Sequence, residues 1–169
     1  MLKGKTKVYK ITALIISLLY IGWAVFLIVE AFMNGEASSK QSNGVTEVVV
    51  ETVNEIAGHE VIKNDEETRA IVRKVLGHFG GFFILAILSS FAYFMIFYKK
   101  IALPIILSFT NGLALAFITE FIQLFKDGRS GEIKDVLIDY SGFLLSGIII
   151  TLILSIVRYK RNKPNLKQS

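Results

Sequence analysis

Three carboxylates of this chain stand at the edges of two strongly apolar stretches. Glu120, Asp135 and Asp139 lie between "SFTNGLALAFI", residues 108–118, and "FLLSGIIITLILSIV", residues 143–157. A bare carboxylate is costly in hydrocarbon, so such residues usually pair with a polar group or line a wet cavity. At these positions they could bind a cation, hydrogen-bond a polar ligand, or serve as a general acid and base.

Helical spacing predicts which way these acids point, because residues three and four positions apart share one face of a helix. The first stretch gives a stripe of Gly112, Ala116, Glu120 and Gln123. The second gives a stripe of Asp135, Asp139, Gly142 and Ser146. Small residues let helices approach closely in lipid. We therefore expect both stripes to face other helices, with Phe143 on a different face.

A basic residue and a histidine accompany the acids. Arg129 lies in the short segment between the two stripes, within reach of all three carboxylates, and His78 begins another apolar stretch. The candidate site is therefore a polar cluster at one end of a helix bundle, made of His78, Glu120, Gln123, Arg129, Glu132, Asp135 and Asp139.

Three interpretations of this cluster stay open. It could be a structural clamp in which Arg129 pairs with the carboxylates, since buried polar groups also join helices in membranes. It could be a site for a polar or anionic group, because a guanidinium suits phosphate or carboxylate. It could also be a divalent-cation site of carboxylates plus His78. No recognised ligand spacing is present, so the sequence predicts no metal or cofactor and assigns no catalytic residue.

The elements that must position these residues are membrane spans. The chain has 169 residues, of which 53% are hydrophobic, and no cysteine that could form a disulfide or a thiolate metal site. About 20 apolar residues cross a bilayer, and four segments qualify: 11–32, 76–98, 101–125 and 136–157. The first is longer than the apolar core of a signal peptide. The sequence thus predicts an all-α bundle of four transmembrane helices, and its small-residue faces allow an oligomer.

The distribution of charge predicts the orientation of this bundle. Residues 1–10, the turn at Lys99 and Lys100, and the tail 158–169 together carry eleven basic residues and no acid. Short basic flanks stay in the cytoplasm. We therefore expect a multi-pass plasma-membrane protein with both termini cytoplasmic and with 34–75 and 126–135 outside. The basic segments are explained by their retention in the cytoplasm and by their attraction to anionic lipid headgroups, so no nucleic-acid partner is expected.

The 34–75 segment has three parts. "NGEASSKQSNG" is typical of a flexible turn. "VTEVVVETVNEI" fits either an amphipathic helix on the outer leaflet or a partly ordered loop. In "NDEETRAIVRKV", Asn64 or Asp65 could cap a helix that continues into the second span. At the start of that span, Gly77 and Gly81 form a Gly-xxx-Gly pair, which predicts helix packing.

The region around the carboxylates resembles the VanZ-like membrane proteins. Their signature of Glu-x-x-Gln, Gly-Arg, acidic residues and Asp-x-x-x-Asn-x-x-Gly matches Glu120, Gln123, Gly128, Arg129, Glu132, Asp135 and Gly142. Asp139 stands where many members carry Asn. Upstream, "VRKVLGHFGGFF" is similar to the Arg-Lys…His-Phe entry into a span, although Gly80, Gly81 and Phe82 replace other family residues. The resemblance covers about residues 73–150, so 76–157 is expected to form a VanZ-like core.

The resemblance implies a small membrane protein of the cell envelope, and the family's namesake is associated with resistance to the glycopeptide teicoplanin. Our leading hypothesis is recognition of a lipid or cell-wall headgroup at the outer leaflet, with an effect on glycopeptide susceptibility. A membrane-embedded enzyme acting on a lipid-linked substrate is the first alternative. A small oligomeric transporter is the second, disfavoured because the inner halves of the spans carry no acid.

Overall fold

The chain is a bundle of long helices. The computed structural model describes residues 2–162, with side chains from 7 to 160; the predicted basic tail therefore lies partly outside the described residues. Every element in this range is helical, which confirms the all-α prediction. The elements are α1 (Leu2–Phe32), α2 (Gly35–Ala57), α3 (Glu66–Val72), the π-helical turn η1 (Arg73–Gly80), α4 (Gly81–Ile96), α5 (Ala102–Gln123) and α6 (Ile133–Asn162).

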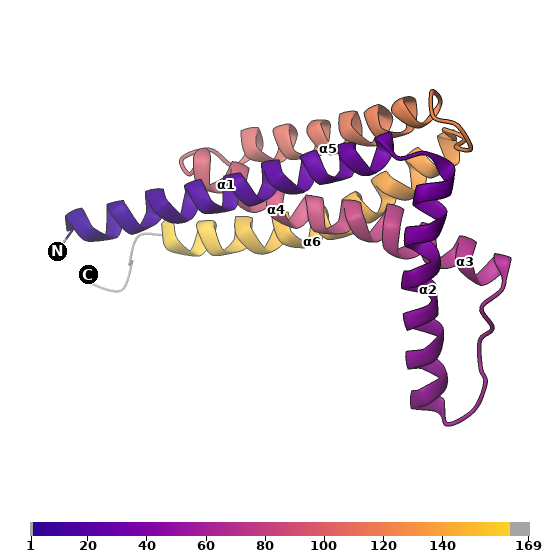
Figure 1. Ribbon diagram of the computed structural model, residues 1–169. Coiled ribbons are helices and arrows are strands. Elements are labelled where there is room, and N and C mark those ends of the chain that lie inside the picture. The colour runs from indigo at the N-terminus through magenta and orange to yellow at the C-terminus, as the bar shows by residue number, and fades with distance from the viewer. Residues whose placement is uncertain (1, 163–169) are drawn as a thin grey trace.

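Within the described residues, four helices are long and apolar enough to cross a membrane. They are Lys7–Phe32, the continuous α3–η1–α4 helix Glu66–Ile96, Ala102–Gln123 and Ile133–Lys160. Each overlaps one of the four predicted spans. Figure 1 shows α1, α4, α5 and α6 side by side, with α1 beginning and α6 ending at the same end of the bundle. The opposite end carries α2, α3 and the α5–α6 loop, and we call it the α2 end.

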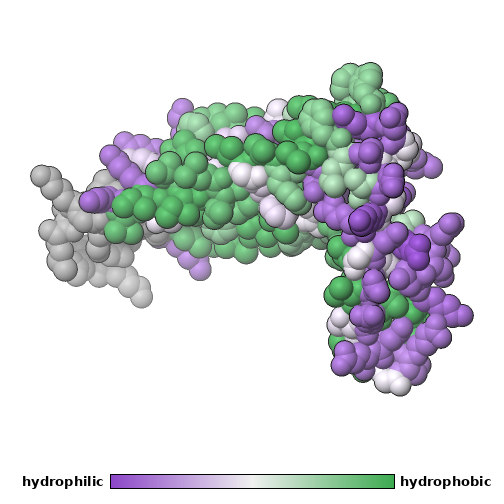
Figure 2. Space-filling view, viewed as in Figure 1, coloured by the Kyte–Doolittle hydropathy of each residue, from purple (hydrophilic) through white to green (hydrophobic). Residues whose placement is uncertain are grey.

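The surface of the bundle divides in the same way. Figure 2 shows a largely apolar surface along the bundle and mostly hydrophilic residues over the α2 end. Large side chains such as Leu18, Ile106 and Leu152 are more than half exposed along the spans. In lipid these faces need no protein partner, because the acyl chains are as apolar as the side chains themselves.

Both predicted small-residue stripes face neighbouring helices. Gly112, Ala116, Glu120 and Gln123 are all buried on α5. On α6, Asp139 and Ser146 are almost fully buried. Phe143, on a different face of α6, is also fully buried, in the core with Leu85 and Ala116. The ring fills the space left by a glycine on α5, so two faces of α6 are packed rather than one.

Of the four glycines predicted to pack, Gly112, Gly142 and Gly81 admit close approach between helices, and one does not. Gly112 lies against the ring of Phe143. A Cβ added at Gly142 would lie 2.2 Å from the backbone oxygen of Phe79, and one at Gly81 would lie 3.0 Å from Leu27 Cδ2. Gly77, by contrast, is exposed, and a Cβ there would meet only an Arg73 carbon at 3.9 Å. The predicted Gly77–Gly81 packing pair is therefore wrong at its first member.

The segment predicted as a flexible turn is the first part of a helix. The side chain of Asn34 accepts a hydrogen bond from Ala37 N and so caps α2. The Gly35 amide donates to the Asp127 backbone oxygen at 2.8 Å, which ties this start to the α5–α6 loop. Capping and this tertiary contact outweigh the poor helix propensity of the Ser/Asn/Gly run. Of the two alternatives for "VTEVVVETVNEI", the helix is confirmed, and Thr46 and Val50 are its buried residues.

The predicted helix start before the second span is also confirmed. Asp65 is the N-cap of α3, and its carboxylate accepts a hydrogen bond of 2.8 Å from Thr68 N. This bond stabilises the charged form and lowers the pKa of Asp65. From this cap the chain stays helical through η1 into α4, and it carries His78 on the π-helical turn. Such turns occur frequently at functional sites.

Candidate functional site

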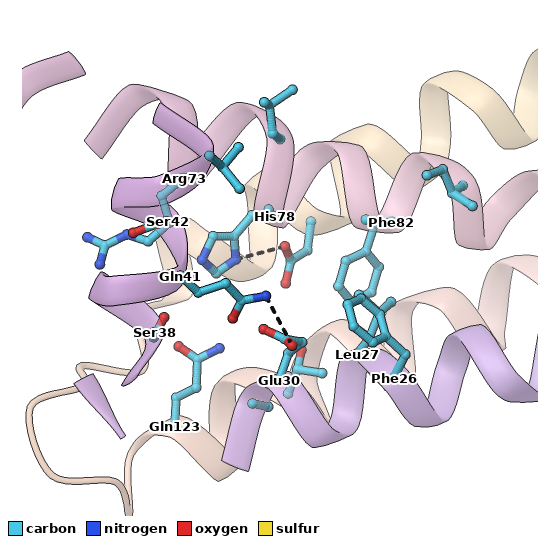
Figure 3. Close-up of a pocket in the computed structure, with 18 of the residues that line it drawn as sticks. Phe26, Leu27, Glu30, Ser38, Gln41, Ser42, Arg73, His78, Phe82 and Gln123 are labelled. Atoms are coloured by element: carbon cyan, nitrogen blue, oxygen red, sulfur yellow. Dashed lines mark hydrogen bonds and ion pairs between the residues drawn. The ribbon is translucent and has the colours of Figure 1, made fainter. Parts of the chain in front are cut away.

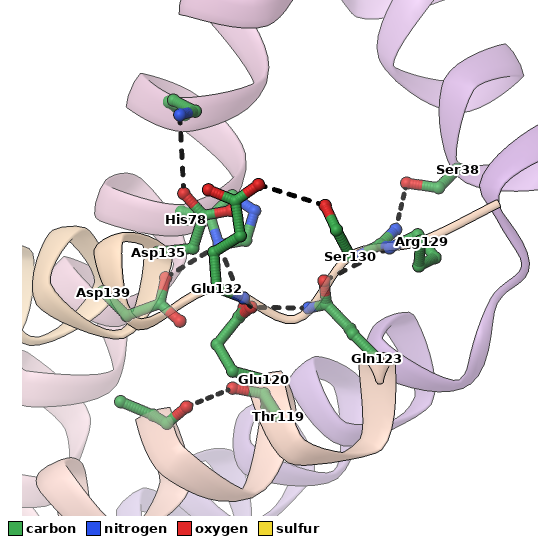
Figure 4. A network of polar contacts seen from close by, with 12 residues as sticks. Ser38, His78, Thr119, Glu120, Gln123, Arg129, Ser130, Glu132, Asp135 and Asp139 are labelled. Atoms are coloured by element: carbon green, nitrogen blue, oxygen red, sulfur yellow. Dashed lines mark hydrogen bonds and ion pairs between the residues drawn. The ribbon is translucent and has the colours of Figure 1, made fainter. Parts of the chain in front are cut away.

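The predicted polar cluster forms at the α2 end. Its members come from η1 (His78), α5 (Glu120 and Gln123), the α5–α6 loop and α6 (Asp135 and Asp139), and Figure 4 shows them converging. The packing of η1, α5 and α6 places three ionisable side chains together, although they are far apart in the chain. One predicted member differs: the Glu132 side chain is exposed and accepts a hydrogen bond from Ser130 Oγ at 3.2 Å.

His78, Glu120 and Asp139 form the centre of the cluster. His78 Nδ1 lies 3.0 Å from Asp139 Oδ1 and 3.7 Å from Glu120 Oε1. The side chains of Asp139, Glu120 and His78 are 1%, 4% and 14% exposed. Among the described residues these three make one group whose donor atoms all lie within 4.8 Å of one another and could hold a metal ion. The same arrangement could orient the imidazole as an acid or base.

Hydrogen bonds from the adjacent loop fix the Glu120 carboxylate. Its Oε2 accepts from the Glu132 backbone amide at 3.2 Å, and its Oε1 accepts from Gln123 Nε2 at 3.0 Å. Gln123 Oε1 in turn accepts from Arg129 Nε at 3.2 Å, and Arg129 Nη1 donates to Ser38 Oγ on α2. This chain of bonds joins α2, the loop and α5 into one unit.

The clamp between Arg129 and the carboxylates, one of the three interpretations, is wrong. Among the described residues, Arg129 makes no ion pair, and the acids find their basic partners on η1 instead. Lys74 Nζ lies 3.6 Å from Asp135 Oδ1, and His78 pairs with the other two carboxylates. Burial lowers the pKa of the Arg129 guanidinium, with the nearby positive charge of Arg73 acting in the same direction. An arginine in that setting is available to an anion.

A cavity of about 280 Å³ opens beside the cluster, between α1, α2, η1 and α4. One part of its wall is apolar and includes Trp23, Phe26, Leu27 and Phe82. The other part is polar and includes Glu30, Ser38, Gln41, Arg73, His78, Arg129 and Asp139. Figure 3 shows the aromatic and aliphatic side chains gathered on one side and the polar groups on the other. A cavity of this character suits an amphipathic molecule.

Sequence reasoning missed several lining residues. Glu30, which accepts a 3.4 Å hydrogen bond from Gln41, is an acid near the end of an apolar span, and its position alone could have flagged it. Arg73 lies in the recognised "VRKVLGHFGGFF" stretch, five residues before His78. The sequence did not single out Ser38, because its contact with Arg129 and the cavity depends on how α2 packs against the bundle.

Comparison with known proteins identifies the family of this chain. A family model described as VanZ/LLP1 matches residues 16–155. No curated protein and no solved structure matches the chain. The matched region covers most of the chain, including all residues of the central cluster and both arginines of the cavity. This multi-pass membrane protein therefore belongs to the VanZ/LLP1 family.

Proposed function

We propose that this protein binds a membrane amphiphile with an anionic headgroup, such as a phosphate-bearing lipid or a lipid-linked cell-wall precursor. One observation carries the proposal. Arg73 and Arg129 border the same cavity, and neither makes an ion pair among the described residues. A guanidinium binds phosphate or carboxylate through two parallel hydrogen bonds. The apolar wall beside them would contact the first methylene groups of the acyl or prenyl chain.

The orientation predicted from the basic residues supports the same ligand class. It predicts that the α2 end faces outward, where envelope lipids and precursors present their headgroups. An effect on glycopeptide susceptibility would follow if the bound headgroup belonged to a precursor of the cell wall. Such a role requires no catalysis, only selective retention of one amphiphile.

Binding to lipids of defined headgroup tests this proposal. Purified protein in detergent is titrated with phosphatidylglycerol or with phosphatidylcholine, and the retained lipid is measured by native mass spectrometry. Arg129→Lys keeps the charge but loses the planar two-pronged donor, and Arg73→Gln loses both. Hydrogen bonds to charged groups contribute about 1.5–3 kcal/mol, so each variant should bind phosphatidylglycerol about tenfold or more weakly.

The matched control is Arg69→Gln, one helical turn before Arg73. Arg69 Nε donates to Asn64 Oδ1 rather than lining the cavity. This variant should bind phosphatidylglycerol as the wild type does. Equal retention of the anionic and zwitterionic lipids by the wild type, or equal binding by all three variants, would refute the proposal.

A second candidate is an enzyme acting on a lipid-linked substrate. The observation that favours it is the partly buried pair of His78 and Asp139, whose Nδ1 and Oδ1 atoms are 3.0 Å apart and which both line the cavity. A carboxylate that orients an imidazole in this way is a common arrangement for proton transfer. Incubation with a labelled lipid-linked precursor, followed by chromatography, would reveal a product with wild type and none with His78→Gln. If the protein retained the labelled precursor but formed no product, the result would support binding rather than catalysis.

A further inference from the structure

We propose that His78, Glu120 and Asp139 form a binding site for a divalent first-row transition-metal ion, such as Zn²⁺ or Mn²⁺. One imidazole nitrogen and two carboxylate oxygens are established ligand types for such ions. The three ligands come from η1, α5 and α6. Their sequence spacing therefore matches no metal motif, which is why the sequence predicted no metal.

The geometry of the donor atoms fits a single ion. Two donors that each lie about 2.1 Å from one ion, at tetrahedral or octahedral angles, are about 3.0–3.4 Å apart. His78 Nδ1 lies 3.0 Å from Asp139 Oδ1 and 3.7 Å from Glu120 Oε1. The first separation lies in this range, the second is a few tenths of an ångström outside it, and all three donor atoms lie within 4.8 Å of one another. Side-chain rotation would close these donors around one ion.

An unpartnered buried oxygen points to the same ligand. The Asp139 side chain is 1% exposed, and its Oδ2 makes no hydrogen bond. Figure 4 shows the carboxylate of Asp139 turned toward the space shared with His78 and Glu120. A buried acceptor without a donor destabilises the fold. A metal ion would supply the missing partner.

The charge of the donor set suits a divalent cation. Lys74 pairs with Asp135, so the cationic partner left for Glu120 and Asp139 within 4.0 Å is His78. A divalent ion would balance the negative charge of two carboxylate ligands.

The surrounding hydrogen bonds hold one ligand in place. Glu120 accepts from the Glu132 amide and from the Gln123 side chain, and Arg129 fixes the direction of the Gln123 amide. Partners of this kind orient metal ligands and raise metal affinity. Because His78 and Asp139 also line the cavity, an ion could enter from there. Three protein ligands leave at least one position open toward the cavity.

The test uses the metal ion alone. Full-length protein carrying an affinity tag without histidine is stripped with a chelator in detergent and titrated with Zn²⁺ against a chromophoric competitor. We expect one Zn²⁺ per chain and much weaker binding of Mg²⁺, which prefers oxygen ligands. His78→Gln and Asp139→Asn should each weaken Zn²⁺ binding at least about tenfold. After loading with Mn²⁺, pulsed EPR should detect a coupled histidine nitrogen that disappears in His78→Gln.

The chain provides matched controls. His59 is its other histidine, exposed in the segment after α2, and Asp127 is an exposed acid in the α5–α6 loop. His59→Gln and Asp127→Asn should leave Zn²⁺ affinity unchanged. Absence of stoichiometric Zn²⁺ binding by the wild type, equal losses in site and control variants, or Mn²⁺ without histidine coupling would each overturn the proposal. The wild-type stoichiometry and EPR spectrum decide the question even if Asp139→Asn fails to fold, and no lipid enters the assay.

Discussion

Gly142 sets the distance between α6 and the π-helical turn, and its replacement by alanine should destabilise the protein. The added Cβ would lie 2.2 Å from the Phe79 backbone oxygen, 2.9 Å from its carbonyl carbon and 3.0 Å from its Cα. All three atoms belong to the backbone, so no side-chain rotation relieves the clash. Overpacking of this kind costs about 1–3 kcal/mol, which for a chain of this length corresponds to about 2–4 °C per kcal/mol.

The same substitution should also weaken metal binding. Asp139 lies one turn before Gly142 on α6, and His78 is next to Phe79 on η1. If α6 moves away from η1 to admit a methyl group, the 3.0 Å separation between His78 Nδ1 and Asp139 Oδ1 widens. Zn²⁺ affinity should therefore fall together with thermal stability, although residue 142 touches no donor atom of the cluster.

The assay is the unfolding midpoint in detergent, followed by tryptophan fluorescence. Gly22→Ala is the matched control, because a Cβ at Gly22 meets no atom within 4 Å and alanine favours helix over glycine. That variant should unfold at or slightly above the wild-type temperature. Equal midpoints for Gly142→Ala and Gly22→Ala would refute the close approach of α6 to η1.

Three further predictions concern packing, capping and topology. Gly112→Ala should destabilise the bundle, because the new Cβ would lie 2.4 Å from Phe143 Cε2, and the added change Phe143→Leu should restore part of the lost unfolding midpoint; no rescue would contradict the pairing. Asp65→Ala should increase amide hydrogen exchange in the first turn of α3. The pKa of Asp65 is lowered in the folded state. The wild-type cap should therefore be retained above the ordinary aspartate pKa, and it should weaken as the pH falls through the pKa of Asp65 in the folded protein. Asp65→Asn should cap α3 at all pH values, and an unchanged exchange rate in Asp65→Ala would exclude the cap. In intact cells, an impermeant thiol reagent should label Ser39→Cys but not Lys100→Cys, and labelling of the second position would reject the predicted orientation.

The sequence by itself determined the helical class, the four spans and most of the polar cluster. A long apolar segment that crosses a bilayer forms an α-helix, because this structure satisfies every backbone hydrogen bond within the segment. Helical periodicity then placed Glu120, Gln123 and Asp139 on inward faces, and the burial of these residues confirms it. Both kinds of information are local, so they can be obtained from one stretch of chain at a time.

Only the tertiary structure decided which groups meet. The sequence put Arg129 within reach of the acids and left its partner open. Packing of α2 directs its guanidinium to Ser38 and Gln123, while η1 brings His78 and Lys74 to the carboxylates. The same packing buries Phe143 and leaves Gly77 exposed. These contacts depend on the rotation and separation of helices that are distant in the chain. Small residues permit close approach at many positions, and only the assembled bundle selects among them.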